Sequence, residues 1–188
     1  MRLLGSLNCY HNKSHLTLIT YMQFILLTHA REFVKKSATG PIVKQVLAHQ
    51  CSILEWSRTA PDNMLTKGIE QNKTLLIYPE AKGSIRFDIE TQDLSTFDTF
   101  VILDGTWQEA RKIYNRSPYL HPLTHYALKV DYCSRYSLRR NQKNTGLCTA
   151  EVVIELLKQR HYYEQAVKLE VAFTRFNQGL SQTEINND

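Results

Sequence analysis

Short runs of apolar and β-branched residues alternate along this chain with segments whose apolar positions recur at helical spacing. Continuous apolar runs of this length are typical of strands that are covered on both faces of a sheet. We expect such strands at 24–27, 52–56, 73–78 and 99–103, and a fifth strand at 126–130, where apolar and polar residues alternate. Helical spacing begins near Pro41, Asp62, Thr106, Thr149 and Tyr162, and the last of these helices runs to about Phe176. Strands that alternate with helices predict an α/β fold with a mainly parallel sheet flanked by helices.

The rest of the chain lacks these patterns. Residues 81–97 carry mixed charges and little periodicity, which predicts a loop. Residues 1–20 match no pattern, and we expect a variable or loosely ordered N-terminal extension there. At 188 residues the chain has the length of one domain, which we place at 21–178. The remaining 179–188, rich in Ser, Gln and Asn, should fray.

The fourth apolar run ends in the most informative junction of the chain. It stops at Asp104-Gly105, a strong turn pair because glycine accepts positive φ without cost. Thr106 and Glu109 have the spacing of a capping box, which predicts the start of a helix. Ligands of open α/β sheets bind at the carboxyl ends of the strands. Asp104 and the nearby Trp107 are therefore candidate site residues.

Composition changes this picture little. Lys and Arg number 23 against 18 Asp and Glu, and the net charge of +5 favours an anionic partner only weakly. The four cysteines form no CxxC pair, and isolated cysteines are typical of thiols in a reducing cytoplasm. Cys9 lies near His11 and His15, but we expect no metal site there. No segment reaches the ~20 apolar residues of a membrane span. Phosphate-binding glycine motifs are absent as well, so a GTP-binding or dinucleotide-binding protein has no support. We expect a soluble cytoplasmic protein.

Four segments together resemble the DTW-domain family, whose characterised members are tRNA-uridine aminocarboxypropyltransferases. The signature is Asp104-Gly105-Thr106-Trp107. The other segments are 27–32 followed by Thr39-Gly40, then 76–80, and then 134–139 leading to 146–151. They occur in the order of the family and cover roughly 21–157. The chain lacks the N-terminal cysteine cluster that bacterial members often carry.

The resemblance implies a fold and a reaction. DTW domains are similar to the SPOUT superfamily, in which the C-terminal segment forms a trefoil knot. The family transfers the 3-amino-3-carboxypropyl group of S-adenosylmethionine to N3 of a tRNA uridine, without a metal. The expected partner is tRNA, and we expect no association with a membrane. The oligomeric state is left open, with a monomer favoured. Two alternatives are an RNA methyltransferase of SPOUT-like fold and a non-catalytic RNA-binding module.

The resemblance also suggests roles for single residues. Asp104 is the expected catalytic residue, as the base that removes the uridine proton or as the anchor of the cofactor's α-ammonium group. The alternative is a turn aspartate that binds local backbone N–H groups. Trp107 stacks on a base or on adenine, or else it packs in the core. The cofactor-binding residues implied are Tyr78, Pro79, Glu80, Leu103, Gly105, Thr106, Trp107, Leu147, Cys148 and Thr149, where Cys148 is read as a small buried residue and not as a nucleophile.

Basic side chains complete the expected site. The RNA-binding residues implied are Arg31, Arg111, Arg135, Arg139 and Arg140, of which the last three lie in a loop with Tyr132 and Tyr136. A solvated charge run is the alternative for that loop. Arg31 and Glu32 either pair with each other or line the site, and His29 is read as structural. We expect Pro79, Asp104 and Thr149 to converge on one concave site large enough for S-adenosylmethionine, with the arginine loop along its rim.

Overall fold

A six-stranded parallel sheet forms the centre of the molecule. The computed structural model describes residues 22–70, 73–79, 83–137 and 146–185. Within them, the strand order is β2-β1-β5-β3-β6-β4, and every neighbouring pair is parallel. The strands are β1 Gln23–Thr28, β2 Cys51–Glu55, β3 Thr74–Ile77, β4 Ile85–Arg86, β5 Thr99–Asp104 and β6 Thr124–Tyr126. The prediction of an α/β fold with a mainly parallel sheet is confirmed.

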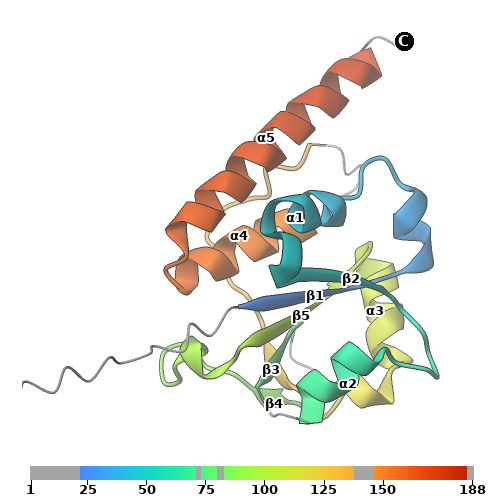
Figure 1. Cartoon of the computed structure of the whole chain (residues 1–188), viewed down its shortest axis with the longest axis vertical. Helices are drawn as coiled ribbons and strands as arrows, with labels where there is room; N and C mark the ends of the chain where they lie inside the picture. The colour runs from blue at the N-terminus through green and yellow to red at the C-terminus, as the bar shows by residue number, and fades with distance from the viewer. Residues whose placement is uncertain (1–21, 71–72, 80–82, 138–145, 186–188) are drawn as a thin grey trace, which may run out of the picture.

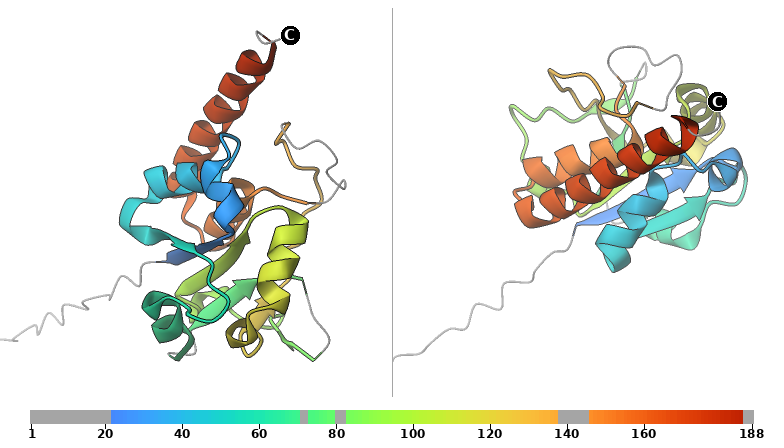
Figure 2. Two further views of the ribbon diagram at one scale, coloured as in Figure 1. Left: turned by 90° about the vertical axis from the view of Figure 1, so that its right-hand side faces the viewer. Right: turned by 90° about the horizontal axis from the view of Figure 1, so that it is seen from above.

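Helices cover both faces of this sheet (Figure 1). The α-helices are α1 Gly40–Leu47, α2 Asn63–Glu70, α3 Trp107–Asn115, α4 Thr149–Gln159 and α5 Tyr163–Ile185. Short 3-10 helices lie at η1 Ala30–Val34, η2 Ala48–Gln50, η3 Leu94–Thr96 and η4 Pro118–Leu120. Helices α1, α4 and α5 lie on one face, and α2 and α3 on the other (Figures 1 and 2). Helices α1, α2 and α3 each connect two parallel strands and bring the chain back over the sheet between them.

The central strands supply the core on both sides. Phe24 and Leu26 of β1 face the α1/α4/α5 layer, while Ile25 and Leu27 face the α2/α3 layer, and all four are buried. Burying one such side chain contributes about 1.5–3 kcal/mol. Continuous apolar runs, rather than alternating ones, are what a strand covered on two faces needs. This requirement explains why β1 and β5 could be located from the sequence.

The register of the strands brings their carboxyl ends to one edge. Thr28 at the end of β1 lies opposite Asp104 at the end of β5. The chain turns directly after both residues, and the His29 amide donates to the Asp104 carbonyl over 3.0 Å. On the other side of β5, Ile77 of β3 pairs with Ile102, so Tyr78 extends from the same edge. The expected junction of strand ends is therefore present.

The edge of the sheet beyond β3 differs from the prediction. The fifth strand was expected at 126–130 but spans Thr124–Tyr126, and the residues after it leave the sheet. Leu128 packs against the core on the α4 side instead. The apolar and polar residues around Leu128 therefore alternate as in a strand, although this segment lies outside the sheet. The predicted loop at 81–97 contains the short strand β4. Its two residues are exposed and too few to produce a hydrophobic pattern.

The last helix is longer than predicted. Helix α5 was expected to end near Phe176, with a frayed tail at 179–188, but it continues to Ile185. Glycine inside a helix costs only about 1 kcal/mol, and a helix that is already formed can continue past it. Gly179 therefore gave a misleading stop signal.

Other expectations remain predictions. The extension at 1–20, with Cys9, His11 and His15, lies outside the described residues. The limits of the catalytic domain, the likeness to the SPOUT superfamily and the trefoil knot remain expectations from the family resemblance. Among the helices that the structure describes, none combines the length and the apolar character needed to cross a membrane.

Candidate active site

Asp104 joins three elements that are distant in sequence. Its side chain is 4% exposed at the end of β5. Oδ2 accepts a hydrogen bond from the Thr28 hydroxyl over 3.0 Å, and Oδ1 accepts one from the Thr149 hydroxyl over 2.6 Å. Thr28 ends β1, and Thr149 is the first residue of α4. These bonds to distant hydroxyls differ from the local backbone contacts of a simple turn aspartate.

The start of α1 also approaches the Asp104 carboxylate. A Cβ atom on Gly40, the first residue of α1, would lie 2.9 Å from Oδ2 of Asp104. The starts of α1 and α4 contact each other as well, because the Ala150 amide donates to the Thr39 hydroxyl over 3.3 Å. Helix N-termini carry a partial positive charge that favours a nearby anion. The carboxylate thus lies where two helices begin.

A second buried carboxylate fixes the chain segment in front of α4. Glu151 is 2% exposed and accepts from the Cys148 amide at 2.9 Å, the Ser134 hydroxyl at 2.6 Å and the Arg135 amide at 2.7 Å. It therefore binds both its own helix start and the segment at 134–135. Burial raises the pKa of the Cys148 thiol to about 12. Cys148 is a small buried residue, as expected, and its thiol is protonated at neutral pH.

Aromatic rings form a second group at the same edge. Trp107 is 56% exposed and stacks on Tyr78, with the ring centroids 5.7 Å apart and an angle of 17° between the rings. Tyr78 in turn stacks on Tyr114, with centroids 4.6 Å apart. We call Trp107, Tyr78 and Tyr114 the aromatic column. The alternative in which Trp107 packs in the core is wrong, because more than half of the residue is exposed.

The start of α3 has the predicted capping box. The Glu109 amide donates to the Thr106 hydroxyl at 3.3 Å, and the Thr106 amide donates to Oε2 of Glu109 at 2.8 Å. Burial alone would raise the pKa of Glu109, but the hydrogen bonds from Thr106 and from other neighbours lower it to about 2. Lys35 lies 3.3 Å from the same carboxylate. Glu109 is therefore an anion that holds η1 next to α3.

Residues of η1 and its cap differ partly from expectation. Glu32 is buried and pairs with Lys35, not with Arg31, which is exposed. Burial raises the pKa of Glu32. His29 caps η1, since its Nδ1 accepts from the Arg31 amide at 3.3 Å, and its ring stacks on Trp56. Burial lowers the pKa of His29 and favours the neutral ring. These contacts agree with the structural role that the sequence suggested.

The predicted cofactor residues separate into groups. Asp104 and Thr149 are hydrogen-bonded on the side of α1 and α4, while Tyr78 and Trp107 are stacked beside α3. Leu103 faces the core under α2 and α3. Thr106 is engaged in the helix cap, and Gly105 passes so close to Glu109 that a Cβ atom would lie 2.9 Å from its Cβ. Pro79 is exposed, Leu147 is half-buried, and Glu80 lies outside the described residues.

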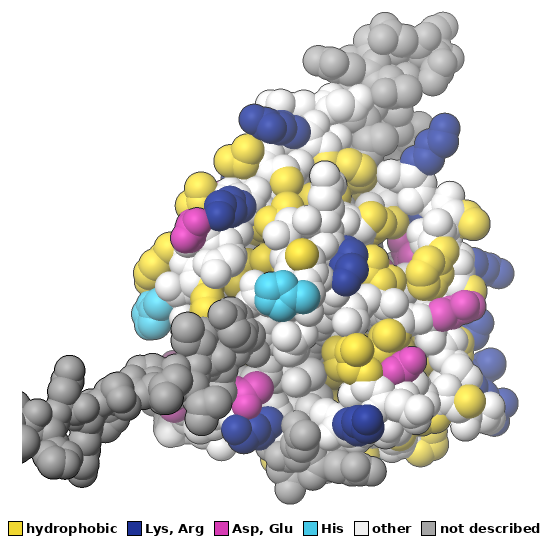
Figure 3. All heavy atoms as spheres, in the orientation of Figure 1, with side chains coloured by type: hydrophobic (Ala, Val, Ile, Leu, Met, Phe, Trp, Pro, Cys, Tyr) yellow, Lys and Arg dark blue, Asp and Glu magenta, His cyan; other side chains and the backbone are white. Residues whose placement is uncertain are grey.

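The predicted RNA-binding arginines are only partly described. Arg111 is exposed on α3, one helical turn after Trp107. The Arg135 guanidinium pairs with Glu170 of α5 at 2.5 Å, and Tyr136 is buried with its hydroxyl donating to the Ser37 carbonyl. Arg139 and Arg140 lie outside the described residues. On the face seen in Figure 3, basic side chains are interspersed with acidic ones and do not form one continuous patch.

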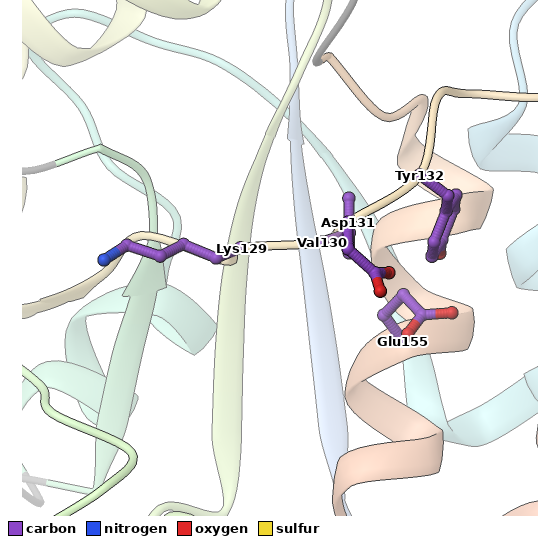
Figure 4. Close-up of a pocket in the computed structure, with 5 residues that line it drawn as sticks. All are labelled: Lys129, Val130, Asp131, Tyr132 and Glu155. Atoms are coloured by element: carbon purple, nitrogen blue, oxygen red, sulfur yellow. The ribbon is translucent and has the colours of Figure 1, made fainter.

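A cavity of about 400 Å³ opens at a different place. Its lining residues are Lys129, Val130, Asp131, Tyr132 and Glu155, between the segment after β6 and the side of α4 (Figure 4). Asp131 and Tyr132 lie close to Glu155, while Lys129 points away from them (Figure 4). None of the predicted cofactor residues lines this cavity, so the concave site for S-adenosylmethionine stays a prediction. No group of three or more His, Cys, Asp and Glu side chains is placed as metal ligands among the described residues.

Sequence reasoning missed several residues of this edge. Thr28 donates to the Asp104 carboxylate, Gly40 leaves the space that a Cβ atom would take from it, and Lys35 connects Glu32 with Glu109. Thr28 had a signal as a polar residue that ends an apolar strand, and Gly40 lay in a segment that resembles the family. The contacts of Gly40 and Lys35 depend on the packing of η1 and α1 over the ends of the strands.

The structure defines the class of this protein. It is a parallel α/β domain with a buried carboxylate and stacked aromatic rings at the strand ends. The chain belongs to the DTW domain family, since the family model described as the DTW domain matches residues 4–180.

Three curated relatives are similar at low identity, and each is named tRNA-uridine aminocarboxypropyltransferase 2. The protein of Macaca fascicularis is 26% identical over 149 residues, 76% of this chain and 50% of the relative. That of Drosophila melanogaster is 26% identical over 139 residues, 72% of this chain and 55% of the relative. That of Mus musculus is 25% identical over 148 residues, 76% of this chain and 50% of the relative. The chain thus spans about half the length of these relatives. No solved structure matches it.

Proposed function

We propose that this chain modifies a uridine of tRNA by transferring the 3-amino-3-carboxypropyl group of S-adenosylmethionine to N3 of the base. The match of the DTW domain to residues 4–180 carries the proposal, and the shared name of the three relatives gives the reaction. Because only half of each relative is covered, the proposal concerns the chemistry of this domain.

The reaction needs alignment and the removal of one proton. S-adenosylmethionine supplies a sulfonium with three electrophilic carbons, and the transferred group depends on which carbon lies in line with the nucleophile. N3 of the uridine gives its proton to solvent water and bonds to the carbon of the aminocarboxypropyl group, while the bond from that carbon to sulfur breaks. The electron pair of the broken bond stays on sulfur, which leaves as a neutral thioether. The protein must therefore hold both partners in line at the sheet edge.

The surroundings of Asp104 favour an anion. The hydroxyl donors Thr28 and Thr149 stabilise its carboxylate form, and the N-termini of α1 and α4 favour an anion there. A carboxylate at this position can accept a charge-assisted hydrogen bond from an ammonium group. We therefore assign Asp104 to the α-ammonium group of S-adenosylmethionine, with Thr28 and Thr149 as positioning residues.

Incubation with unmodified tRNA and S-adenosylmethionine, followed by nucleoside mass spectrometry, tests the function. We expect a uridine that has gained the mass of the aminocarboxypropyl group. A gain of one methyl group would instead indicate an RNA methyltransferase. Unchanged nucleosides despite tight binding of tRNA would indicate a binding module and would contradict the proposal.

A further inference from the structure

The exposed ring of Trp107 forms the outer end of the aromatic column and is supported from within the fold. The Tyr78 amide donates to the Tyr126 carbonyl over 3.2 Å, which fixes the backbone of the middle residue of the column. His125 is fully buried and meets Tyr78 and Tyr114 edge-on, with centroids 6.3 and 5.2 Å away. A ring held in this way is already oriented before any ligand arrives, which lowers the entropy cost of binding.

His125 adds an uncharged support to the column. Its Nδ1 lies 3.4 Å from the Pro79 carbonyl, which can accept a hydrogen bond from it, and its Nε2 is buried without a hydrogen-bond partner. Burial lowers the pKa of His125 and favours the neutral ring. The column therefore rests on uncharged rings, and its exposed end presents an aromatic surface.

Positive charge lies beside this surface. Arg111 follows Trp107 by one turn of α3, so the two residues lie on the same side of the helix. Arg111 is exposed and close enough to Tyr78 to act on its hydroxyl electrostatically. Glu109, the nearby acid, is paired with Lys35 and engaged in the helix cap. An aromatic surface next to an exposed basic residue is suited to a base and its phosphate.

The column and the Asp104 carboxylate lie on opposite sides of the sheet edge. Asp104 bonds toward Thr149 of α4, whereas Tyr78 and Tyr114 belong to the cluster under α2 and α3. Asp104 and Trp107 are nevertheless three residues apart, so their Cα atoms are at most about 11 Å apart. The column and the carboxylate are therefore close enough to serve one stretch of RNA.

From these observations we infer that Trp107 is a stacking platform for an unpaired base of the RNA substrate, next to the uridine that reacts. Arg111 binds the phosphate of that nucleotide. The choice of RNA as the ligand rests on the proposed function. The inference adds that Trp107 selects RNA strands whose bases are not stacked on one another. A base stacked on Trp107 extends the column by one ring, and Asp104 is left to the reacting groups.

Binding of a short single-stranded oligouridylate and of unmodified tRNA tests the platform. Stacking on an aromatic residue is worth about 1–3 kcal/mol per base, so Trp107→Ala should weaken binding about 5- to 150-fold, while Trp107→Phe should retain most of the affinity. Tyr163→Ala is the matched control, because Tyr163 is 57% exposed on α5 on the other face of the sheet. Binding by Trp107→Ala equal to that of the control, or equal losses for the Ala and Phe variants, would overturn the inference.

Fluorescence and salt dependence separate the possible ligands. The chain has two tryptophans, so the signal lost in Trp107→Phe belongs to Trp107. We expect oligouridylate to quench it. Quenching by S-adenosylmethionine alone, without RNA, would place the cofactor's adenine on Trp107 and overturn the platform. The logarithm of the affinity for RNA falls linearly with the logarithm of the salt concentration. Arg111→Ala should make this slope shallower by the contribution of about one phosphate contact, whereas Trp107→Ala should leave it unchanged.

The two proposals fail differently. If the unaltered chain binds oligouridylate through Trp107 but mass spectrometry finds no modified uridine, the platform stands and the proposed function fails. If modified uridine forms and Trp107→Ala binds tRNA as the unaltered chain does, the function stands and the platform fails.

Discussion

The Thr149 hydroxyl donates a hydrogen bond of 2.6 Å to Oδ1 of Asp104 and thereby joins the start of α4 to the end of β5. The two residues are 45 positions apart in the chain, and both are buried. A buried polar atom that loses its partner costs about 1–3 kcal/mol. This bond therefore serves both the fold and the geometry of the candidate site, and substitutions can separate the two roles.

Asp104→Asn removes the negative charge at nearly constant size. The amide still offers an oxygen acceptor to one hydroxyl, and threonine hydroxyls can rotate to accept from its NH₂ group. We expect a folded protein that binds S-adenosylmethionine much more weakly and whose turnover falls about 100-fold or more. Calorimetric affinity and turnover are measured on the same sample. A loss of turnover with unchanged affinity would assign Asp104 to the uridine proton instead, and near-normal turnover would exclude both roles.

Thr149→Val replaces the hydroxyl with a methyl group of similar volume. The Asp104 carboxylate loses a donor, so the free energy of unfolding should fall by about 1–3 kcal/mol, and turnover should fall with it. Thr149→Ser keeps the hydroxyl and should restore turnover. Thr174→Val on α5, where the hydroxyl bonds to the Glu170 carbonyl at an exposed position, is the control. If Thr149→Val and Thr174→Val change turnover equally, Thr149 has no positioning role.

Local signals in the sequence identified the elements that hold Asp104. The apolar run of β5, the turn at Gly105 and the capping box of Thr106 with Glu109 each involve neighbours in the chain. Propensity and spacing determine such features before any tertiary contact forms. For this reason the end of β5 and the start of α3 were predicted almost to the residue.

The contacts between elements could not be predicted in the same way. Whether Trp107 is buried or exposed depends on how α3 lies on the sheet, and a single tryptophan at a helix start carries no periodicity. The pairing of Glu32 with Lys35 and the three bonds of Glu151 depend on the paths of η1 and of the segment at 134–135. Alternation after Tyr126 wrongly suggested a strand, because Leu128 is directed to the core by a chain that has left the sheet.

Glu109 should make stability depend on acid pH. Its pKa is near 4.5 in an unfolded chain and about 2 in the folded one, because Thr106 and its other neighbours donate hydrogen bonds to the carboxylate. A lowered pKa contributes stability that is present above pH 4.5 and is lost as the pH falls from about 4.5 to about 2. Glu109→Gln keeps an oxygen that can accept from the Thr106 amide but loses the negative charge beside Lys35 and the start of α3. It should be less stable at pH 7 by about 0.3–1 kcal/mol and should show a shallower decline over that window.

Urea unfolding between pH 7 and pH 2 measures this dependence. Glu164→Gln is the matched control, because Glu164 is exposed on α5 and pairs with Lys168 in solvent. Such surface pairs contribute little, so the control should follow the unaltered protein. An equally steep decline in Glu109→Gln would mean that other carboxylates carry the acid sensitivity.

Gly40→Ala tests the close approach of α1 to Asp104. The added Cβ would lie 2.9 Å from Oδ2 of Asp104 and 3.3 Å from Cδ1 of Leu26, so one of these groups must move. Leu26 is fully buried in the core, and the carboxylate is held by Thr28 and Thr149. We expect the carboxylate to shift and weaken those hydrogen bonds, so that turnover falls strongly.

Gly179→Ala is the control for this substitution. A Cβ on Gly179 would meet nothing within 4 Å, so α5 should gain helix stability without any change in turnover. Thermal unfolding and turnover are compared for both variants. If Gly40→Ala also keeps its turnover, the carboxylate can move by several tenths of an ångström without consequence. The position of Asp104 would then be irrelevant to the reaction, and the assignment of Asp104 to the ammonium group would be wrong.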